Sequence, residues 1–541
     1  MKNFSAFLLL LCASSAFVQI NNCLPPTSQT DLDINNVRAT ILNGGDMWWD
    51  LNINPKYEVP KGSGKHSMFS GGIWVGGFDS GNQLKIAAQT YRQNGVDFWA
   101  GPINTVTGNT EQLACNLYDR HWKINKQDVI NFINTGVPTL DMITYPGNGN
   151  PAYNHTQFLA PFFDANGDGI YDPWNGDYPL YDFNGTTCKD VLLGDQTIWW
   201  VFNDIGNIHG QSEGIPMGLE VHAMAYAYYS FDEAINNATF YSYKFINRSS
   251  NILDSTYLGF YTDFDVGNYL DDYVGCDVGL SLGYGYNGDT NDDGPAGYGQ
   301  NPPAVGQVIL EGPIGYNGNI LKMTNFMNGF FDWWGFPPET IDYYNKLKSI
   351  WQDGMPLTFG GSGYGGTVPT TYLFPDSSNP ANPILWSEGS AGMLMGDRSF
   401  LQSSGPFQML PGQVHYVNTA VVWARTTGGG PIPSLLLLKD AATTVQDYFD
   451  NCFLGVGVTE NEILNGIKLF PNPSVTGKFI LANLPSNSEI SIFNSEGKLI
   501  EKKEINTNKI EWESKNNFKG IYFIKIKNKN AVKTMKWVNL N

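Results

Sequence analysis

The fold of this chain is decided by two stretches, Thr239-Phe240-Tyr241-Ser242-Tyr243-Lys244-Phe245-Ile246 and Thr256-Tyr257-Leu258-Gly259-Phe260-Tyr261-Thr262-Asp263-Phe264. Both are rich in aromatic and β-branched residues, the residue types that favour β-strands. The connection between them contains Asn247-Arg248-Ser249-Ser250-Asn251, a polar run typical of turns. We therefore expect two long strands joined by a polar turn, in a protein that is mainly β.

Other segments extend this pattern. A further long strand is predicted at Val414–Ala424, after the turn signal Pro411-Gly412. Three short helices are predicted at residues 125–134 with Asn125 as N-cap, from Pro338-Glu339 onward, and after Ser434. For residues 24–455, called the passenger below, we expect a β-sandwich-like structure of two or three packed units with a few short helices.

Composition excludes several classes of protein. The chain has 541 residues and a formal net charge of -19, and 35 of its 51 acidic residues are aspartate. Aromatic residues make up 14% of the chain and charged residues 15%. A disordered chain has fewer aromatics and a higher charge density, and a coiled coil is richer in Ala, Glu, Lys, Leu and Arg. The acidity argues against nucleic acid and anionic membranes as partners, because like charges repel.

The N-terminus has the features of a secretory signal peptide, which we assign to residues 1–19. Lys2 supplies the positive charge, residues 7–11 are apolar, and Ser14-Ser15-Ala16 offers small residues for cleavage. No other segment reaches the about 20 apolar residues of a membrane-spanning helix, so no transmembrane segment is predicted. Export permits disulfides. Removal of the signal peptide takes away Cys12 and leaves five cysteines, an odd number: Cys23, Cys115, Cys188, Cys276 and Cys452. At least one thiol is free or pairs outside the chain, and their spacing leaves both one and two internal bridges open.

The composition changes near residue 466. Residues 466–541 contain 13 Lys, 6 Glu and neither Arg nor Asp, a net charge of +7, which leaves -26 for the rest of the chain. We assign residues 456–465 to a linker and residues 466–541 to a separate domain. Strand-like segments separated by turn signals, at residues 478–481, 490–493, 521–527 and 532–538, predict a small C-terminal antiparallel β-sandwich.

The same domain contains Leu469-Phe470-Pro471-Asn472-Pro473, Gly477-Lys478-Phe479, Gly497-Lys498 and Gly520-Ile521-Tyr522-Phe523, followed by lysines near the C-terminus. With these motifs it resembles a type A C-terminal sorting domain of the type IX secretion system of Bacteroidota. The resemblance implies contact with that secretion machinery and transport across the outer membrane. The mature protein is then expected to be released or attached to surface lipopolysaccharide. The sorting motif is carried by Pro471, Asn472, Pro473, Gly520, Tyr522 and Lys525.

The passenger also resembles an uncharacterised β-rich module of secreted Bacteroidota proteins that carry the same tail. The resemblance runs through residues 33–39, 43–50, 72–77, 90–93, 164–178, 263–277 and 403–407. Because no biochemical activity is associated with that module, the resemblance implies a class and an extracellular location, but no reaction.

The strongest chemical signal is the acidic loop Asp164-Ala165-Asn166-Gly167-Asp168-Gly169-Ile170-Tyr171-Asp172. Ca²⁺ takes about 6–8 oxygen ligands. The predicted ligands are the side chains of Asp164, Asn166, Asp168 and Asp172 and the carbonyl of Ile170, completed by Asp177. Asn175 stands where an EF-hand has its glutamate, so the loop fits a non-EF-hand extracellular calcium site. The alternative is a turn-rich loop with solvated carboxylates.

Two further acidic groups are cation candidates. The second cluster consists of Asp263, Asp265, Asp271, Asp272 and Asp277, and the third of Asp289, Asn291, Asp292 and Asp293. Crowded carboxylates repel one another unless a cation or protons neutralise them. This predicts a weaker calcium site at the second cluster, whereas the third is better interpreted as a flexible acidic loop.

Catalytic motifs fail on their context. The stretch 283–288 matches GxGxxG but no helix is predicted after it, and Ser212 and Ser281 lie in GxSxG patterns without the helix of a nucleophile elbow. No HExxH zinc motif is present. The pairs Trp48-Trp49, Trp199-Trp200 and Trp333-Trp334 are interpreted as core residues, with a glycan-binding platform as the alternative.

Three functional hypotheses follow. The preferred one is a calcium-stabilised secreted or cell-surface protein with a structural or adhesive role and no identified catalysis. The alternative is a carbohydrate-binding or glycoside-hydrolysing surface protein, for which surface glycans would be the partners. The third is a secreted hydrolase, which requires Ser212 or Ser281 within hydrogen-bond reach of a histidine.

Overall fold

In the computed structural model of the chain, residues 239–246 lie within β14 (Ala238–Asn247) and residues 256–264 within β15 (Leu253–Phe264). The structure describes residues 23–180, 194–329, 336–452, 466–494, 498–513, 519–528 and 531–541. Both strands form as the sequence predicts. They do not pair with each other, because the connection between them carries the chain from one sheet to a second, facing sheet.

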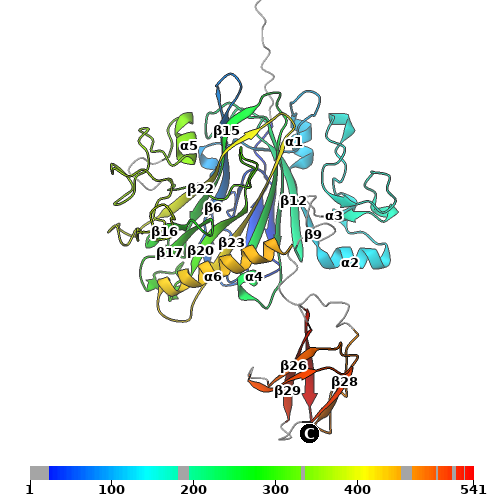
Figure 1. The fold of residues 1–541 in the computed structure, drawn as a ribbon. Helices are drawn as coiled ribbons and strands as arrows, with labels where there is room; N and C mark the ends of the chain where they lie inside the picture. The colour runs from blue at the N-terminus through cyan, green and yellow to red at the C-terminus, as the bar shows by residue number, and fades with distance from the viewer. Residues whose placement is uncertain are drawn as a thin grey trace, which may run out of the picture. The chain divides into compact units, whose positions relative to one another are not determined.

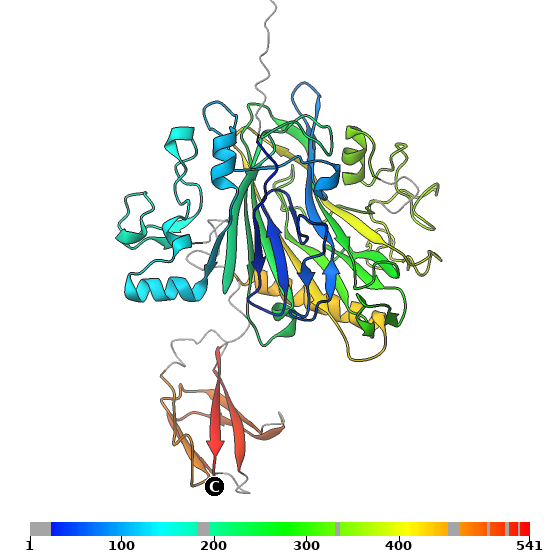
Figure 2. The same cartoon turned by 180° about the vertical axis from the view of Figure 1, so that it is seen from behind.

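The first sheet has ten strands in the order β21-β22-β15-β6-β3-β2-β4-β5, with β1 paired to β2 and β7 to β6. Their bounds are β1 Gln29–Leu32, β2 Arg38–Leu42, β3 Asp46–Met47, β4 Tyr57–Glu58, β5 His66–Met68, β6 Ser70–Phe78, β7 Leu84–Ala88, β21 Asn325–Asn328 and β22 Arg398–Met409. Seen from behind, the N-terminal strands of this sheet are drawn in blue (Figure 2).

The second sheet has nine strands in the order β16-β17-β20-β23-β14-β13-β12-β8, with β9 paired to β12. Their bounds are β8 Trp99–Ala100, β9 Trp122–Asn125, β12 Gln196–Asn203, β13 Leu219–Ala227, β16 Asp272–Asp277, β17 Leu282–Asn287, β20 Ala304–Glu311 and β23 Val414–Ala424. Two small ribbons complete the passenger, β10 (Phe162–Phe163) with β11 (Tyr178–Pro179) and β18 (Asn291–Asp292) with β19 (Gly299–Gln300).

The two large sheets pack face to face around one core (Figure 1). Successive side chains of a strand point to opposite faces, so Tyr241, Tyr243 and Phe245 of β14 all enter this core. The rings of Tyr243 and Phe260 lie 5.8 Å apart across the sandwich. Trp48 Nε1 donates to Tyr241 Oη at 2.8 Å. The predicted sandwich is therefore confirmed, with about 40% strand and 13% helix.

Helices cover the outer faces of the sandwich. In α5 (Thr340–Leu347), Tyr343 and Tyr344 pack on Trp74 and its neighbours in the first sheet. In α6 (Pro431–Asp450), which crosses β20 and β23 in Figure 1, Gln446 Nε2 donates to the Leu310 carbonyl at 3.3 Å. The remaining helices are α1 Gln112–Tyr118, α2 Lys126–Thr135, α3 Leu140–Ile143 and α4 Glu233–Asn236, with 3₁₀ turns η1 Arg92–Asn94, η2 Pro151–Tyr153 and η3 Pro173–Asn175.

All three predicted helices form, as α2, α5 and α6, although α6 begins three residues earlier than Ser434. Within the described residues, no helix combines the length and apolar character that crossing a bilayer requires.

The chain divides into two compact units, residues 1–446 and residues 447–541. The second contains two small antiparallel sheets, ordered β24-β25-β28 and β27-β26-β29-β30. Their bounds are β24 Lys468–Phe470, β25 Lys478–Ala482, β26 Ser488–Asn494, β27 Leu499–Ile505, β28 Lys509–Glu513, β29 Gly520–Asn528 and β30 Ala531–Asn539. The predicted signal peptide at residues 1–19 and the predicted linker at 456–465 lie outside the described residues.

Cysteines Cys23 and Cys115 form a disulfide that ties the first described residue to α1. Cys452 is also disulfide-bonded, whereas Cys276 is a buried free thiol. Cys188 lies outside the described part of the chain. The one free thiol among the described cysteines agrees with the odd count in the sequence.

Candidate metal centre

Three acidic side chains meet where β15 ends and β22 begins. Asp263 pairs in register with Ser399 of β22, Asp265 directly follows β15, and Asp397 directly precedes β22. One carboxylate oxygen from each lies within 4.8 Å of the others. Calcium binds oxygens at about 2.3–2.6 Å, so two ligands of one ion can be at most about 5 Å apart. We call these three residues the Asp263 cluster. The spacing of their oxygens fits a single shared cation.

Burial and mutual repulsion raise the pKa values of these carboxyl groups. Asp263 is only 6% exposed, and burial followed by the charges of Asp265 and Asp397 raises its pKa well above the usual range. Burial and the charge of Asp397 raise the pKa of Asp265 to about 7, and burial raises that of Asp397 to about 6. Three such groups are costly to ionise together without a compensating positive charge.

Among the described residues, no lysine or arginine is paired with these carboxylates. The nearest guanidinium in sequence belongs to Arg398, whose Nε donates to both carboxylate oxygens of Glu388 at 2.9 and 3.2 Å. Its charge lowers the pKa of Asp397, but the effect of burial is larger.

Asp272, a further member of the second cluster, lies beside this group, and Asp271 is its neighbour in the chain. Asp272 is fully buried, and its Oδ2 accepts from the Val266 N–H at 3.0 Å. Burial, and after it the neighbouring charges that include Asp265, raises the pKa of Asp272 well above its usual range. Oδ1 of Asp272 and Oδ1 of Asp271 are buried and have no hydrogen-bond partner among the described residues. Buried oxygens without a donor are unfavourable unless an ion, a water or a proton satisfies them.

Asp277 lies apart from these residues, at the other end of β16. Its carboxylate pairs with Lys439 of α6 at 3.3 Å, and Lys439 also pairs with Asp376 at 3.0 Å. The structure thus brings Asp263, Asp265 and Asp272 together and adds Asp397 to them. Asp271 lies next to Asp272 and Asp292, and Asp277 forms a separate ion pair.

The acidic loop of residues 164–177 is closed at its base by the pairing of β10 with β11. Both oxygens of Asp164 accept backbone N–H groups, from Gly167 and Gly169, at 2.7 Å each. Both oxygens of the buried Asp177 also accept, from Ala165 at 2.8 Å and from Asp172 at 2.9 Å.

The other predicted ligands of this loop bond within it too. Asn166 Nδ2 donates to Asp168 Oδ2 at 2.8 Å, and Asp168 Oδ1 accepts from the Ile170 N–H at 2.7 Å. Asp172 Oδ1 accepts from the Trp174 N–H at 2.9 Å. Such Asx turns are what a metal-free loop would form, yet each carboxylate oxygen keeps a second lone pair for an ion.

The third cluster is split between solvent and interior. Asp289 and Asp293 are exposed, and Asn291 Nδ2 donates to Asp293. Asp292 is buried, accepts from the N–H groups of Asn268 at 3.0 Å and Tyr298 at 2.6 Å, and has a pKa that burial raises to about 6. Asp292 therefore fixes the loop between β18 and β19.

Within the described part of the chain, neither serine of the GxSxG patterns is hydrogen-bonded to a histidine. Ser212 is buried and its Oγ donates to the buried carboxylate of Asp97. His209 instead lies with Nδ1 2.8 Å from the Ile86 carbonyl and Nε2 2.6 Å from the Asp204 carbonyl. Among the described residues, Ser281 Oγ accepts from the Met323 N–H and bonds to no histidine. These contacts give the hydrolase hypothesis no support.

The two tryptophan pairs within the described residues lie in the core. Trp48, Trp49, Trp199 and Trp200 are each 2% exposed or less, so they offer no platform to a glycan. Trp333-Trp334 lies outside the described residues.

The sorting-motif residues sit around the C-terminal strand of the small sandwich. The Pro471 carbonyl accepts from Trp537 Nε1 at 3.1 Å. Asn472 binds β30 twice, donating from Nδ2 to the Lys536 carbonyl at 2.7 Å and accepting from the Val538 N–H at 3.0 Å. Pro473 follows directly.

In β29, which Gly520 begins, residues alternate between the core and solvent, so Tyr522 is buried and Lys525 is exposed. The tyrosine ring lies 5.3 Å from that of Trp537. Pro471, Asn472 and Tyr522 therefore join the ends of the domain.

Comparison with known proteins identifies this C-terminal domain. A family model described as a secretion system C-terminal sorting domain matches residues 468–539. No curated protein has a significant sequence match to the chain.

Among solved structures, a polysaccharide lyase is similar at 10% identity and a TM-score of 0.17, over 59% of this chain and 34% of that one. PorZ, an essential bacterial surface component of the type IX secretion system of Porphyromonas gingivalis, is similar at 10% identity and a TM-score of 0.14, over 64% and 43%. The matches thus span less than half the length of either protein, and TM-scores this low identify no shared fold. The chain is a secreted or cell-surface protein that carries a type IX secretion system C-terminal sorting domain.

Proposed function

We propose that the passenger is a calcium-stabilised domain with a structural or adhesive role, in a protein that is secreted or held at the cell surface. The Asp263 cluster carries this proposal, because it combines cation-compatible spacing with burial and with no neutralising base among the described residues. A divalent cation there would remove the repulsion and join the end of β15 to the start of β22, its neighbour in the first sheet.

Two features support calcium over a transition metal. The group offers carboxylate oxygens only, which suit hard cations such as Ca²⁺ better than softer metals that prefer imidazole or thiolate. An extracellular location gives access to calcium at the weak affinities, about 10⁻⁴–10⁻³ M, that extracellular modules use. The loop of residues 164–177 is the second proposed site, with ligands Asp164, Asn166, Asp168, Ile170, Asp172 and Asp177.

Calcium titration of the full-length protein tests this proposal. After treatment with EDTA and buffer exchange, calorimetry should show saturable Ca²⁺ binding, and the melting temperature should rise when calcium is added. At about 100 times Kd, a ligand that binds only the native state adds about 2.7 kcal/mol of stability. Absence of binding heat together with a melting temperature that neither calcium nor EDTA changes would refute the proposal.

A further inference from the structure

A cavity of about 190 Å³ lies between the loop that follows β8 and the 3₁₀ turn η2. Hydrogen bonds join these two segments, since the N–H and Oγ1 of Thr105 both donate to the Asn154 carbonyl, at 3.0 and 2.8 Å. The start of the loop is anchored as well, because the Ile103 N–H donates to the buried Glu220 carboxylate at 2.7 Å. Hydrogen bonds therefore hold the segments that line the cavity in place.

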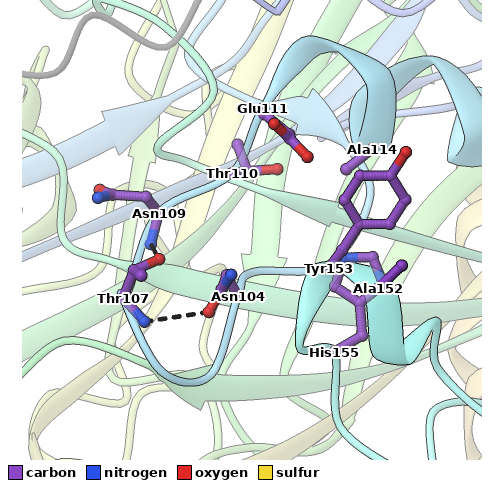
Figure 3. A pocket seen from close by; sticks show the side chains of 9 residues that line it. All are labelled: Asn104, Thr107, Asn109, Thr110, Glu111, Ala114, Ala152, Tyr153 and His155. Carbon is purple, nitrogen blue, oxygen red and sulfur yellow. Dashed lines mark hydrogen bonds between the residues drawn. The ribbon is translucent and has the colours of Figure 1, made fainter.

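One wall presents amide and hydroxyl groups, with Asn104, Thr107 and Asn109 along the left of Figure 3. Asn104 Oδ1 accepts from the N–H groups of Val106 and Thr107, at 2.9 and 3.0 Å, which fixes the orientation of the amide. Its Nδ2 group has no acceptor among the described residues, and a bound molecule could supply one.

The opposite wall is aromatic. The rings of Tyr153 and His155 stack with centroids 5.5 Å apart and planes 24° from parallel. Burial lowers the pKa of His155 to about 4, so the imidazole is neutral at pH 7. The hydroxyl of Tyr118 lies 3.4 Å from His155 Nδ1. This wall offers ring faces and neutral hydrogen-bonding groups, not a positive charge.

Of the described residues that line the cavity, Glu111 is the one that carries a charge at pH 7. It occupies the N-cap position of α1, but its side chain makes no capping bond there. Within the described chain its carboxylate is in no ion pair, so both oxygens can accept hydrogen bonds from a ligand. Because the described lining includes no lysine or arginine, it offers no counter-charge to a phosphate or a carboxylate ligand. A single carboxylate also lacks the partner that glycoside hydrolysis requires.

We propose that this cavity, the Tyr153 pocket, binds one neutral sugar ring without cleaving it. Sugar hydroxyls both donate and accept, which matches the amide of Asn104 and the carboxylate of Glu111, while the C–H face of a ring packs on an aromatic surface such as Tyr153. Sites for drug-sized ligands enclose about 300–1,000 Å³, so this pocket holds one ring at the end of a glycan and not a longer segment. The inference names a ligand for the proposed adhesive role and does not depend on calcium.

The test is saturation-transfer NMR and calorimetry of the full-length protein with glucose, galactose, mannose and N-acetylglucosamine, each in calcium and in EDTA. For a partly open polar pocket of this size, at least one neutral sugar should bind with Kd on the order of 1 mM. Glucuronate, which adds a negative charge, should bind at least about tenfold more weakly, a difference of about 1.4 kcal/mol.

Variants locate the binding site. Tyr153→Ala and Glu111→Gln should each weaken sugar binding by about tenfold or more, while Tyr229→Ala and Glu233→Gln, at exposed positions outside the pocket, should leave it unchanged. Circular dichroism should show all four variants folded. The inference is overturned if none of the four sugars binds, or if binding survives both pocket variants. Sugar binding without calcium binding would reject only the proposed calcium role, and the reverse result only the pocket.

Discussion

Asp397→Asn is expected to make the protein more stable in EDTA and, at the same time, to remove most of the stability that calcium adds. Without a cation, the substitution removes the charge of Asp397, which burial already disfavours and which repels negative charge on Asp263 and Asp265 and so raises their pKa values. At an effective dielectric constant of about 20, relief of this repulsion should add about 1–3 kcal/mol at neutral pH. With calcium present, the same change deletes a charged ligand and should lower affinity.

Opposite signs in the two buffers distinguish an ion site from ordinary packing. A carboxylate that only stabilises its neighbours through hydrogen bonds would make the protein less stable in both conditions when it is replaced. Urea unfolding of the wild type and of Asp397→Asn, each in EDTA and in saturating calcium, measures the four free energies. Asp265→Asn should reproduce the crossover, since Asp265 has the same neighbours.

Asp440→Asn is the matched control, because Asp440 is exposed on α6, which contacts the second sheet, whereas β15 and β22 belong to the first. It should change neither the stability in EDTA nor the gain on adding calcium by more than about 0.5 kcal/mol. If Asp397→Asn lowers stability in EDTA and keeps the full response to calcium, the Asp263 cluster is not the cation site.

The contrast between Asp265 and Asp397 shows what the sequence could and could not predict. Asp263 and Asp265 stand out as a local acidic run at the end of a predicted strand, and the structure keeps them together. Asp397 has no acidic run around it and reaches the site only because β22 pairs with β15 in one register. Sequence patterns of period two predict strands, but strand pairing across more than a hundred residues is decided by the whole sandwich.

The same limit applies to the strands themselves. The aromatic and β-branched runs predicted β14 and β15 to within a few residues, because local preference and burial agree there. Nothing in the turn between them shows that they face each other across the core. The Tyr153 pocket was missed for a related reason, since Glu111 and Tyr153 come from separate loops that Thr105 and Asn154 join.

Among the substitutions proposed for this protein, Glu220→Ala is expected to cause the largest loss of stability. The Glu220 carboxylate is fully buried and accepts from Arg248 Nη2 at 2.7 Å and from the Ile103 N–H at 2.7 Å. His222 Nε2 lies 2.8 Å from the same group. Glu220→Ala would leave all three partners unpaired, and breaking a buried ion pair in this way costs about 3–5 kcal/mol.

The pH dependence of this loss follows from the pKa of Glu220. Burial alone would raise that pKa, but the bonds and charges of His222 and Arg248 outweigh it and hold the value at about 2. Since burial also lowers the pKa of His222, the ring is a neutral donor at pH 7 and Arg248 is the charged partner. An unfolded glutamate titrates near 4.3, so between these values the unfolded state binds more protons and stability falls as the pH falls. The contribution is complete above about pH 5 and is lost as the pH approaches about 2.

Urea unfolding of wild type and Glu220→Gln between pH 7 and pH 3.5 measures this dependence. The glutamine keeps the shape and loses the charge, so we expect a loss of about 1.5–3 kcal/mol at pH 7. That difference should shrink by about 1–2 kcal/mol at pH 3.5, because the wild-type carboxylate has then lost part of its advantage over the unfolded state. Glu233→Gln, on the exposed first turn of α4, should match the wild type throughout. A difference that stays constant with pH would mean that Glu220 acts through packing and neutral hydrogen bonds, and that its ionised form is not what stabilises the loop beside the Tyr153 pocket.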